Sequence, residues 1–322
     1  MNALPWLNDN ISQWQKIITA KQVPHAILLS GGKGLGKIEL AHRMAHIALC
    51  ENLSTNGVCY KCSGCRLIEV GNHTDLSVIK AEKSVIKVDQ IRTLTKKVVL
   101  SSTRNRYRVI IIENAELMNK ASANALLKTL EEPPGKVILI LTTNDFGSIL
   151  ATIKSRCVKI SVSPPSYNIA FDWLNSQVKQ SNEDIQSSLV LANGAPLVAI
   201  DLLQNNTLNT VREMLSDLNQ LTKNTKSVLD VSKHWCTNEL YLNFPYIATH
   251  FFTMLKSGLN INTLHNRFHL NIQNNYAHVT DLDRKVLKFL SNINKFIKRS
   301  ETALKIELLI EELLINWRND FK

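Results

Sequence analysis

The sequence lacks the features that would place a protein in or across a membrane. No apolar run approaches the ~20 residues that a membrane-spanning helix needs. The first residues, MNALPWLNDN, lack the basic start and apolar stretch of a secretory signal. We therefore expect a cytoplasmic protein that has no membrane contact.

The chain also lacks an internal repeat and a concentrated charge. Its net charge is +11, of which residues 206–322 carry +4. An excess that is spread in this way permits contact with nucleic acid but marks no single basic arm. At 322 residues, 44% hydrophobic and 20% charged, the chain is typical of a globular protein of two or three domains.

Strands and helices alternate in the first half. Short apolar runs rich in β-branched residues predict buried strands at residues 25–30, 75–80, 108–113, 136–143 and 157–162. Helical patterns lie between them, near residues 36–49, 88–100, 119–131 and 146–152. This alternation predicts an α/β domain with a parallel sheet that is covered on both faces.

The second half has no segment that reads as a buried strand. Pro164 and Pro165 close the last strand, and short helices are expected over 166–204 with a break at 192–196. Amphipathic helices follow, with apolar faces at Val286, Leu290, Ile293 and Ile297, and at Ala303, Ile306, Ile310, Leu313 and Trp317. We expect three parts: an α/β domain at 1–163, a small helical domain at 164–205 and a larger helical domain at 206–322.

A glycine-rich loop follows the first predicted strand. The stretch SGGKGLGKIEL has the G-x-x-x-x-G-K spacing of a phosphate-binding loop, in Gly31, Gly36 and Lys37. Backbone N–H groups and a helix N-terminus would then face the phosphates, whereas the alternative is a plain strand-to-helix turn. The hydroxyl that normally follows the lysine and holds Mg²⁺ is missing, because Ile38 stands there.

A second catalytic group is missing at the end of a later strand. A working P-loop ATPase carries a metal-binding Asp there, and in many families a Glu that activates water follows it. The segment VIIIENAELMN offers Glu113 and Asn114 instead. Glu113 can still approach a metal, but Asn114 cannot act as a general base. Together with Ile38, these residues argue against hydrolysis.

Four of the six cysteines lie close together, at Cys50, Cys59, Cys62 and Cys65. In a reducing compartment this spacing predicts a closed, tetrahedral structural Zn²⁺ site rather than disulfides. The alternative is a set of reduced, unliganded cysteines. His73 is too distant in sequence to be the expected ligand, and no basic recognition helix follows that would make the module a DNA-reading finger.

Basic residues alternate in the segment STRNRYR, at Arg104, Arg106 and Arg108. A solvated strand edge is one interpretation of this pattern. The other is non-specific, salt-dependent contact with DNA phosphates.

Several unlinked motifs occur in the order found in one protein family. PHAILLSGGKGLGK (24–37), NALLKTLEEPPGKVILILTTN (124–144), SRC (155–157) and the cysteine cluster resemble the clamp-loader subunits of bacterial DNA polymerase III, which are AAA+ proteins. The resemblance covers most of residues 1–200. It implies a RecA-like AAA+ domain with an inserted zinc module at 50–65, then a helical lid domain and a helical collar domain for oligomerisation.

Within this family the sequence resembles the stationary delta-prime type more than the motor type, gamma/tau. The motor type keeps Ser or Thr at the position of Ile38, an Asp-Glu pair where Glu113-Asn114 stands, and Arg where Leu197 stands. The resemblance therefore implies a non-hydrolysing scaffold. It would join gamma/tau and delta subunits in a five-member ring that opens the sliding clamp and places it on primer-template DNA. Nucleotide binding at Gly31, Gly36 and Lys37 would be weak or absent.

Two residue roles follow from the resemblance alone. Arg156, in SRC, would otherwise be taken for a solvated surface residue, but in clamp loaders this Arg reaches into the neighbouring subunit's ATP site as a trans-acting finger. Thr142, Thr143 and Asn144 match the first sensor of the γ-phosphate, or else they cap a strand end.

Two other functions stay open. The first is an active ATPase of gamma/tau type, which Ile38 and Asn114 disfavour. The second is a DNA-binding protein that acts through its zinc module, which sequence-preferring binding of duplex by the isolated chain would reveal.

Overall fold

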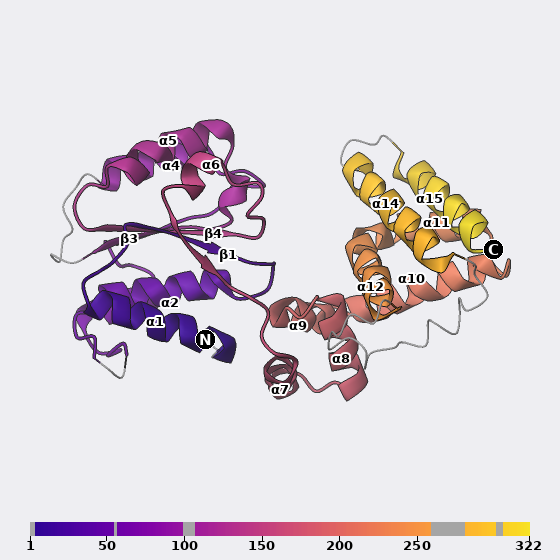
Figure 1. Cartoon of the computed structure of the whole chain (residues 1–322), viewed down its shortest axis with the longest axis horizontal. Coiled ribbons are helices and arrows are strands. Elements are labelled where there is room, and N and C mark those ends of the chain that lie inside the picture. Colours follow the sequence, from indigo (N-terminus) through magenta and orange to yellow (C-terminus); the bar gives the residue numbers. More distant parts are fainter. Residues whose placement is uncertain (1–3, 55–56, 99–106, 259–280, 301–304) are drawn as a thin grey trace. The chain divides into compact units, whose positions relative to one another are not determined.

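The structure is a computed structural model that describes residues 4–54, 57–98, 107–258, 281–300 and 305–322 (Figure 1). It divides into two compact units, Met1–Pro164 and Pro165–Lys322. No helix in the described ranges is both long enough and apolar enough to cross a membrane.

The first unit is built on a five-stranded parallel sheet in the order β2-β3-β4-β1-β5. Its strands are β1 (Ala26–Ser30), β2 (Leu76–Ile79), β3 (Arg108–Ile112), β4 (Val137–Thr143) and β5 (Val158–Ser161). The strands β1 and β4 are buried along their full length, as expected for central strands that are covered on both faces. The α/β prediction and its five strands are confirmed.

Helices cover both faces of this sheet. Figure 1 shows α1 (Asn8–Thr19) and α2 (Lys37–Leu49) on one face, and α4 (Val88–Val98), α5 (Lys120–Glu131) and α6 (Ala151–Lys154) on the other. The unit also contains the short helices η1 (Pro5–Leu7), α3 (Ser63–Glu69) and η2 (Ala115–Leu117). Apolar side chains of α4 and α5 pack against β3 and β4 to form a continuous core.

Three local differences from the sequence-based expectations occur in this unit, and two of them have a clear physical cause. The helix expected near 146–152 is only α6, because Asp145 Oδ1 accepts the backbone N–H of Gly147 at 2.8 Å and holds that segment in a turn. The helices α1 and α3 were not expected. The first is fixed by Trp14, which is buried and donates its Nε1–H to the Met44 carbonyl at 2.9 Å.

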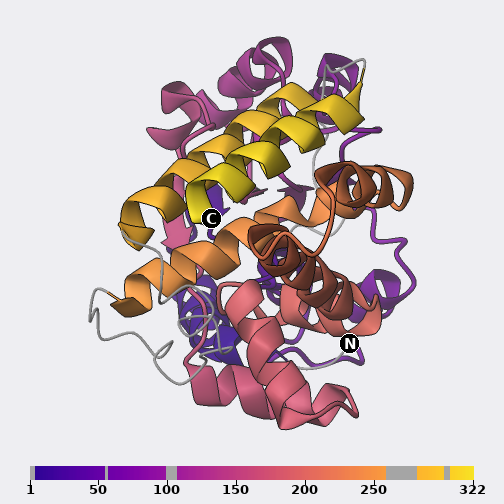
Figure 2. The same ribbon diagram turned by 90° about the vertical axis from the view of Figure 1, so that its right-hand side faces the viewer.

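The second unit contains only helices in its described part, as expected (Figures 1 and 2). The helices α7 (Tyr167–Gln177), α8 (Asn182–Leu191) and α9 (Pro196–Gln204) pack together, and the expected break at 192–196 is the turn between α8 and α9. The remaining helices are α10 (Thr207–Thr222), α11 (Val228–Thr237), η3 (Leu240–Asn243), α12 (Phe244–Gly258), α14 (Leu282–Ser300) and α15 (Ile306–Phe321).

Aromatic rings form much of the core of this unit. Trp317 stacks on Phe321 with ring centroids 3.7 Å apart, and Phe289 lies 4.4 Å from Trp317. Two buried tryptophans also have polar partners: Trp235 Nε1 donates to Asp217 Oδ2 at 2.9 Å, and Trp317 Nε1 donates to the Leu218 carbonyl at 3.0 Å. The core is therefore fixed by directional bonds as well as by packing.

The two predicted apolar faces need partial correction. On α14 the buried line is Val286, Phe289, Ile293 and Phe296, while Leu290 and Ile297 are half-buried. The buried face of α14 is rotated from the predicted one toward Phe289 and Phe296, because these rings contact the aromatic core. On α15 the buried residues include Ile310, Leu313 and Trp317 as expected, Ile306 is half-buried, and Ala303 lies outside the described residues.

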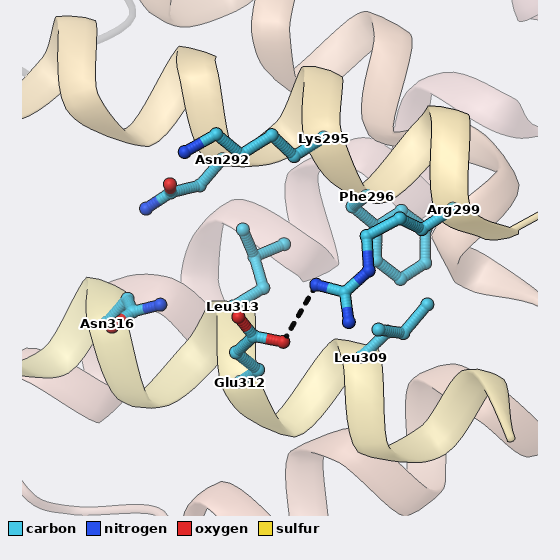
Figure 3. Close-up of a pocket in the computed structure, with 8 residues that line it drawn as sticks. All are labelled: Asn292, Lys295, Phe296, Arg299, Leu309, Glu312, Leu313 and Asn316. Carbon is cyan, nitrogen blue, oxygen red and sulfur yellow. Dashed lines mark hydrogen bonds and ion pairs between the residues drawn. The ribbon is translucent and has the colours of Figure 1, made fainter. Parts of the chain in front are cut away.

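The helices α14 and α15 lie side by side, and a shallow pocket opens between them (Figure 3). Arg299 of α14 and Glu312 of α15 form an ion pair across it at 3.2 Å. Both side chains are more than half exposed, so this pair contributes little to stability.

Candidate nucleotide loop, metal centre and arginine finger

The glycine-rich loop joins β1 to α2, and two of its glycines are required by close packing. Gly36 has φ +82°, and a Cβ there would lie 2.6 Å from Leu4 Cδ1. A Cβ on Gly31 would clash with the carbonyl oxygen of Val162. Both positions therefore exclude larger residues because of contacts within this chain.

Lys37 is the first residue of α2 and is 5% exposed. Its ammonium donates to the Gly32 carbonyl at 2.5 Å and to Asn144 Oδ1 at 2.8 Å. Burial lowers the pKa of Lys37 to about 8, and the charge of Glu116 opposes this shift. The lysine of the loop is thus already hydrogen-bonded inside its own chain.

Asn144, at the end of β4, ties the loop to the neighbouring strand end. Its Nδ2 donates to Asn114 Oδ1 and to Glu116 Oε1, both at 3.0 Å. Thr142 Oγ1 accepts the backbone N–H of Asn114 at 3.0 Å, and Thr143 Oγ1 accepts that of Asp145 at 3.2 Å. Of the three residues at the sensor position, Asn144 joins the loop network and the two threonines cap the strand end.

Glu113 follows β3 at the position where a metal-binding carboxylate is expected. It is 6% exposed, and its Oε1 lies 3.1 Å from Lys80 Nζ and 3.5 Å from His42 Nε2. The Lys80 ammonium therefore stands beside the carboxylate on which a Mg²⁺ ion would depend. Ile38 is 37% exposed and offers no ligand atom.

The four clustered cysteines form a compact sulfur group, in which all four Sγ atoms lie within 4.8 Å of one another. Cys62 and Cys65 are separated by 3.3 Å, Cys50 and Cys59 by 3.6 Å, and Cys59 and Cys65 by 3.8 Å. Zn–S bonds of about 2.3 Å at tetrahedral angles place sulfurs about 3.8 Å apart, so this group fits a tetrahedral ion.

The backbone around the cysteines supplies hydrogen bonds to sulfur. The N–H groups of Glu51 and Cys65 both donate to Cys62 Sγ at 3.4 Å, and Cys59 N–H donates to Cys50 Sγ at 3.4 Å. Such bonds favour thiolates, the form that a metal binds. His73 is not part of this group of four, and its Nδ1 accepts the N–H of Asp75 at 3.1 Å.

Arg156 lies between α6 and β5, and its side chain is 34% exposed. Its Nη2 lies 2.7 Å from Glu131 Oε1, and its Nη1 donates to the Thr152 carbonyl at 2.9 Å and to Ser155 Oγ at 3.3 Å. Both terminal nitrogens of the guanidinium are thus held by groups of the same unit.

The arginine-rich segment divides into two parts. Arg108 begins β3, is largely buried, and pairs with the buried Asp75 at 3.2 Å. For Arg108 the idea of a solvated strand edge is wrong, and this ion pair also leaves it badly placed to contact DNA. Arg104 and Arg106 lie outside the described residues.

Four residues beside these sites were not identified from the sequence: His42, Lys80, Glu116 and Glu131. Each meets its partner across different elements, so no local spacing reveals the contact. For Glu131 the sequence did offer a hint, because it lies in the segment LEEPP, which we used only as part of the family motif.

Comparison with known proteins gives matches along the chain. A family model described as "DNA polymerase III, delta subunit" matches residues 6–166, and one described as "DNA polymerase III subunit delta', AAA+ ATPase lid domain" matches residues 165–204. The chain is 32% identical to DNA polymerase III subunit delta' of Pseudomonas aeruginosa over 247 residues, which are 76% of this chain and 74% of that relative.

Two further relatives come from Buchnera aphidicola subsp. Schizaphis graminum. Its DNA polymerase III subunit delta' is 26% identical over 98% of this chain and 97% of its own length. Its DNA polymerase III subunit gamma is 34% identical over 65% of this chain and 57% of its own length. The chain is therefore similar to both types of subunit, but the match to the delta' subunit spans 98% of this chain and the match to the gamma subunit 65%.

Proposed function

The chain belongs to the family of DNA polymerase III subunit delta', and from that premise we propose that it is a non-hydrolysing scaffold of the replicative clamp loader. It assembles with gamma/tau and delta subunits. The complex opens the sliding clamp and places it on primer-template DNA, which it contacts without sequence preference. This chain's own contribution is to hold the ring and to present Arg156 to a neighbour.

The observation that carries the non-hydrolysing role is the closed state of the nucleotide site. Lys37 is bonded to Asn144, and Glu113 has Lys80 beside it at 3.1 Å. A nucleotide phosphate would have to displace the first contact, and Mg²⁺ would have to compete with an ammonium for the second. With no hydroxyl at position 38, the ion would also lack its usual ligand.

We also propose the three-part division that the sequence suggests: residues 1–163 as the AAA+ domain with its inserted zinc module at 50–65, 164–205 as the lid and 206–322 as the collar. The boundary of the two compact units at Pro164 and Pro165 and the lid match over 165–204 support it. The collar builds ring contacts from its helices.

The four cysteines hold a structural Zn²⁺ in this proposal. Four thiolates complete a tetrahedral shell, so the ion has no open position and supplies cross-linking rather than chemistry. The residues themselves bring the end of α2, where Cys50 lies, against α3, which contains Cys65. The module is a local clip of the chain.

Arg156 acts on the ATP of a neighbouring subunit. A permanently charged, planar guanidinium suits the negative charge of a phosphoryl group in transfer. The Arg156 side chain is 34% exposed, so part of it lies at the surface of its unit. It touches the reacting phosphate only within the assembled ring.

An active ATPase of gamma type is the second candidate, favoured by the likeness to a gamma subunit and by the presence of Lys37. ATP hydrolysis by the isolated chain separates the two. We expect no turnover above background. Turnover in the range of a working AAA+ enzyme that Lys37→Met abolishes would replace the scaffold by the motor.

A further inference from the structure

The contact between Arg156 and Glu131 joins two segments that lie apart in sequence. Glu131 is the last residue of α5, and Arg156 follows α6, which packs against α5. The Nη2–Oε1 distance of 2.7 Å is that of a charge-assisted hydrogen bond. The ion pair therefore fixes the guanidinium against the end of a helix.

The position of Glu131 is unfavourable for a carboxylate on its own. The C-terminal end of a helix carries partial negative charge, which repels an acidic side chain and attracts a basic one. The Arg156 cation offsets this repulsion. Glu132, the next residue, is also exposed at the same helix end. Within the described part of the chain, Arg156 forms its ion pair with Glu131 and not with Glu132.

The helix that carries Glu131 is a rigid support. Leu126 and Leu130 of α5 are buried in the core of the first unit. The Glu131 backbone is therefore held in place, and its carboxylate reaches Arg156 from that fixed point. It can therefore orient a long, flexible side chain such as arginine, which otherwise samples many rotamers.

The contacts of Arg156 divide its donors into two sets. A guanidinium has five N–H groups. Three of them meet Glu131, the Thr152 carbonyl and Ser155 Oγ, within the described part of the chain. The other two remain to donate to a pair of phosphate oxygens, and the first three determine the direction in which they point.

We infer that Glu131 is a positioning residue for Arg156, holding the guanidinium in the orientation in which it meets the neighbouring subunit's nucleotide. This inference rests on the proposed trans-acting role of Arg156. Glu131 itself touches no phosphate. It restricts Arg156 to few orientations beforehand, so that less side-chain entropy is lost when Arg156 meets the developing phosphate charge.

An orienting role has a particular kinetic consequence. A contact made in the transition state raises kcat, whereas binding that is equal in ground state and transition state changes KM. Glu131 should therefore affect the kcat for ATP and leave KM almost unchanged. Since an exposed ion pair is worth a few-fold in an equilibrium constant, we expect a loss of roughly two- to fivefold.

The test uses the complete complex, reconstituted from this chain with the gamma/tau and delta subunits, and measures DNA-stimulated ATP turnover. Glu131→Gln should lower kcat roughly two- to fivefold, which is less than the loss caused by Arg156→Ala. Glu131→Asp should recover part of that loss, because it restores the charge. Glu132→Gln is the matched control, which removes a carboxylate from the same helix end, and it should have no effect.

The double variant separates positioning from an independent effect. In an Arg156→Ala background, Glu131→Gln should cause no further loss, because the group that it positions is gone. A further loss of the same size there, wild-type turnover of Glu131→Gln alone, or turnover above the wild type would each overturn the inference. Wild-type turnover of Arg156→Ala would instead overturn the proposed finger, and the role of Glu131 would fall with it.

Discussion

Lys37 keeps the position of a phosphate-binding lysine, and in the proposed scaffold it no longer serves hydrolysis. Its ammonium donates to Gly32 and Asn144. The proposed closure of this site therefore rests on hydrogen bonds made within the chain as well as on missing ligands. Ile38 and Asn114 could be read from the sequence, but Lys80 beside Glu113 could not, because its segment is distant in sequence.

Asp217 is a buried carboxylate in the second unit that holds two other side chains. It is 2% exposed, accepts the indole N–H of Trp235, and pairs with Lys226. We predict that Asp217→Ala lowers the free energy of unfolding by about 1–3 kcal/mol, because the buried indole N–H loses its acceptor. Asp217→Asn, the control, keeps a side-chain oxygen that can accept the indole N–H and should cost less than Asp217→Ala. Urea unfolding followed by circular dichroism measures both, and equal losses would contradict the assignment.

His250 predicts a pH dependence of stability. Burial lowers the pKa of His250 to about 4, from an ordinary value near 6.5. The unfolded chain binds a proton there below about pH 6.5 and the folded chain does not, so this group's stabilising contribution is present above pH 6.5 and is lost as the pH falls toward 4. The loss amounts to roughly 3 kcal/mol.

The variant His250→Phe tests this contribution, because it keeps a ring in the core and removes the titration. The wild type should lose more unfolding free energy than the variant between pH 6.5 and 4. Parallel pH profiles for the two proteins would show that His250 titrates in the same way in both states.

At the scale of elements, the sheet was predictable and the short helices were not. Short continuous apolar runs rich in β-branched residues, such as VILILTT, favour central strands of a covered sheet, and β4 matches that run. The helix α6 is shorter than expected because one side-chain bond of Asp145 competes with helix formation. The cysteine spacing predicted the four-sulfur group, since ligands of one ion must converge in space.

The cysteine module is a separate small cluster, and this predicts the result of removing its metal. Cys50, Cys62 and Cys65 form a core of their own, distinct from the one under the sheet. We predict one Zn²⁺ per chain, and local loss of protection around residues 50–72 when Cys62→Ser and Cys65→Ser are combined, while the sheet stays folded. Structural zinc contributes on the order of 10 kcal/mol of apparent binding free energy in small peptides.

Metal analysis and hydrogen exchange of purified protein measure these effects, with Cys236→Ser as the control outside the cluster. A chain purified without zinc, or full zinc content in the double variant, would contradict the site. Loss of exchange protection throughout the sheet would contradict the module's independence.

At the scale of the whole molecule, the chain combines one α/β unit, which contains the glycine-rich loop and the partly exposed Arg156, with one unit whose described part is helical. The sequence predicted both units and the motifs, because each depends on local patterns. It could not predict the ion pair of Arg156 with Glu131 or the network around Asn144, because these depend on how separate elements meet. Such contacts are set by tertiary packing alone.

The most direct test of the scaffold account is clamp loading by two otherwise identical reconstituted complexes, one with Lys37→Met and the other with Arg156→Ala in this chain. The account predicts that the Lys37→Met complex loads clamps and turns over ATP like the wild type, because this chain hydrolyses no ATP of its own. It predicts that the Arg156→Ala complex assembles but loads slowly. Fingers of this kind are worth roughly 10³–10⁵-fold in small GTPases, and the loss here should be smaller because one finger serves one of several ATP sites. If the Lys37→Met complex did not load clamps while the Arg156→Ala complex loaded them at the wild-type rate, the scaffold account would be contradicted.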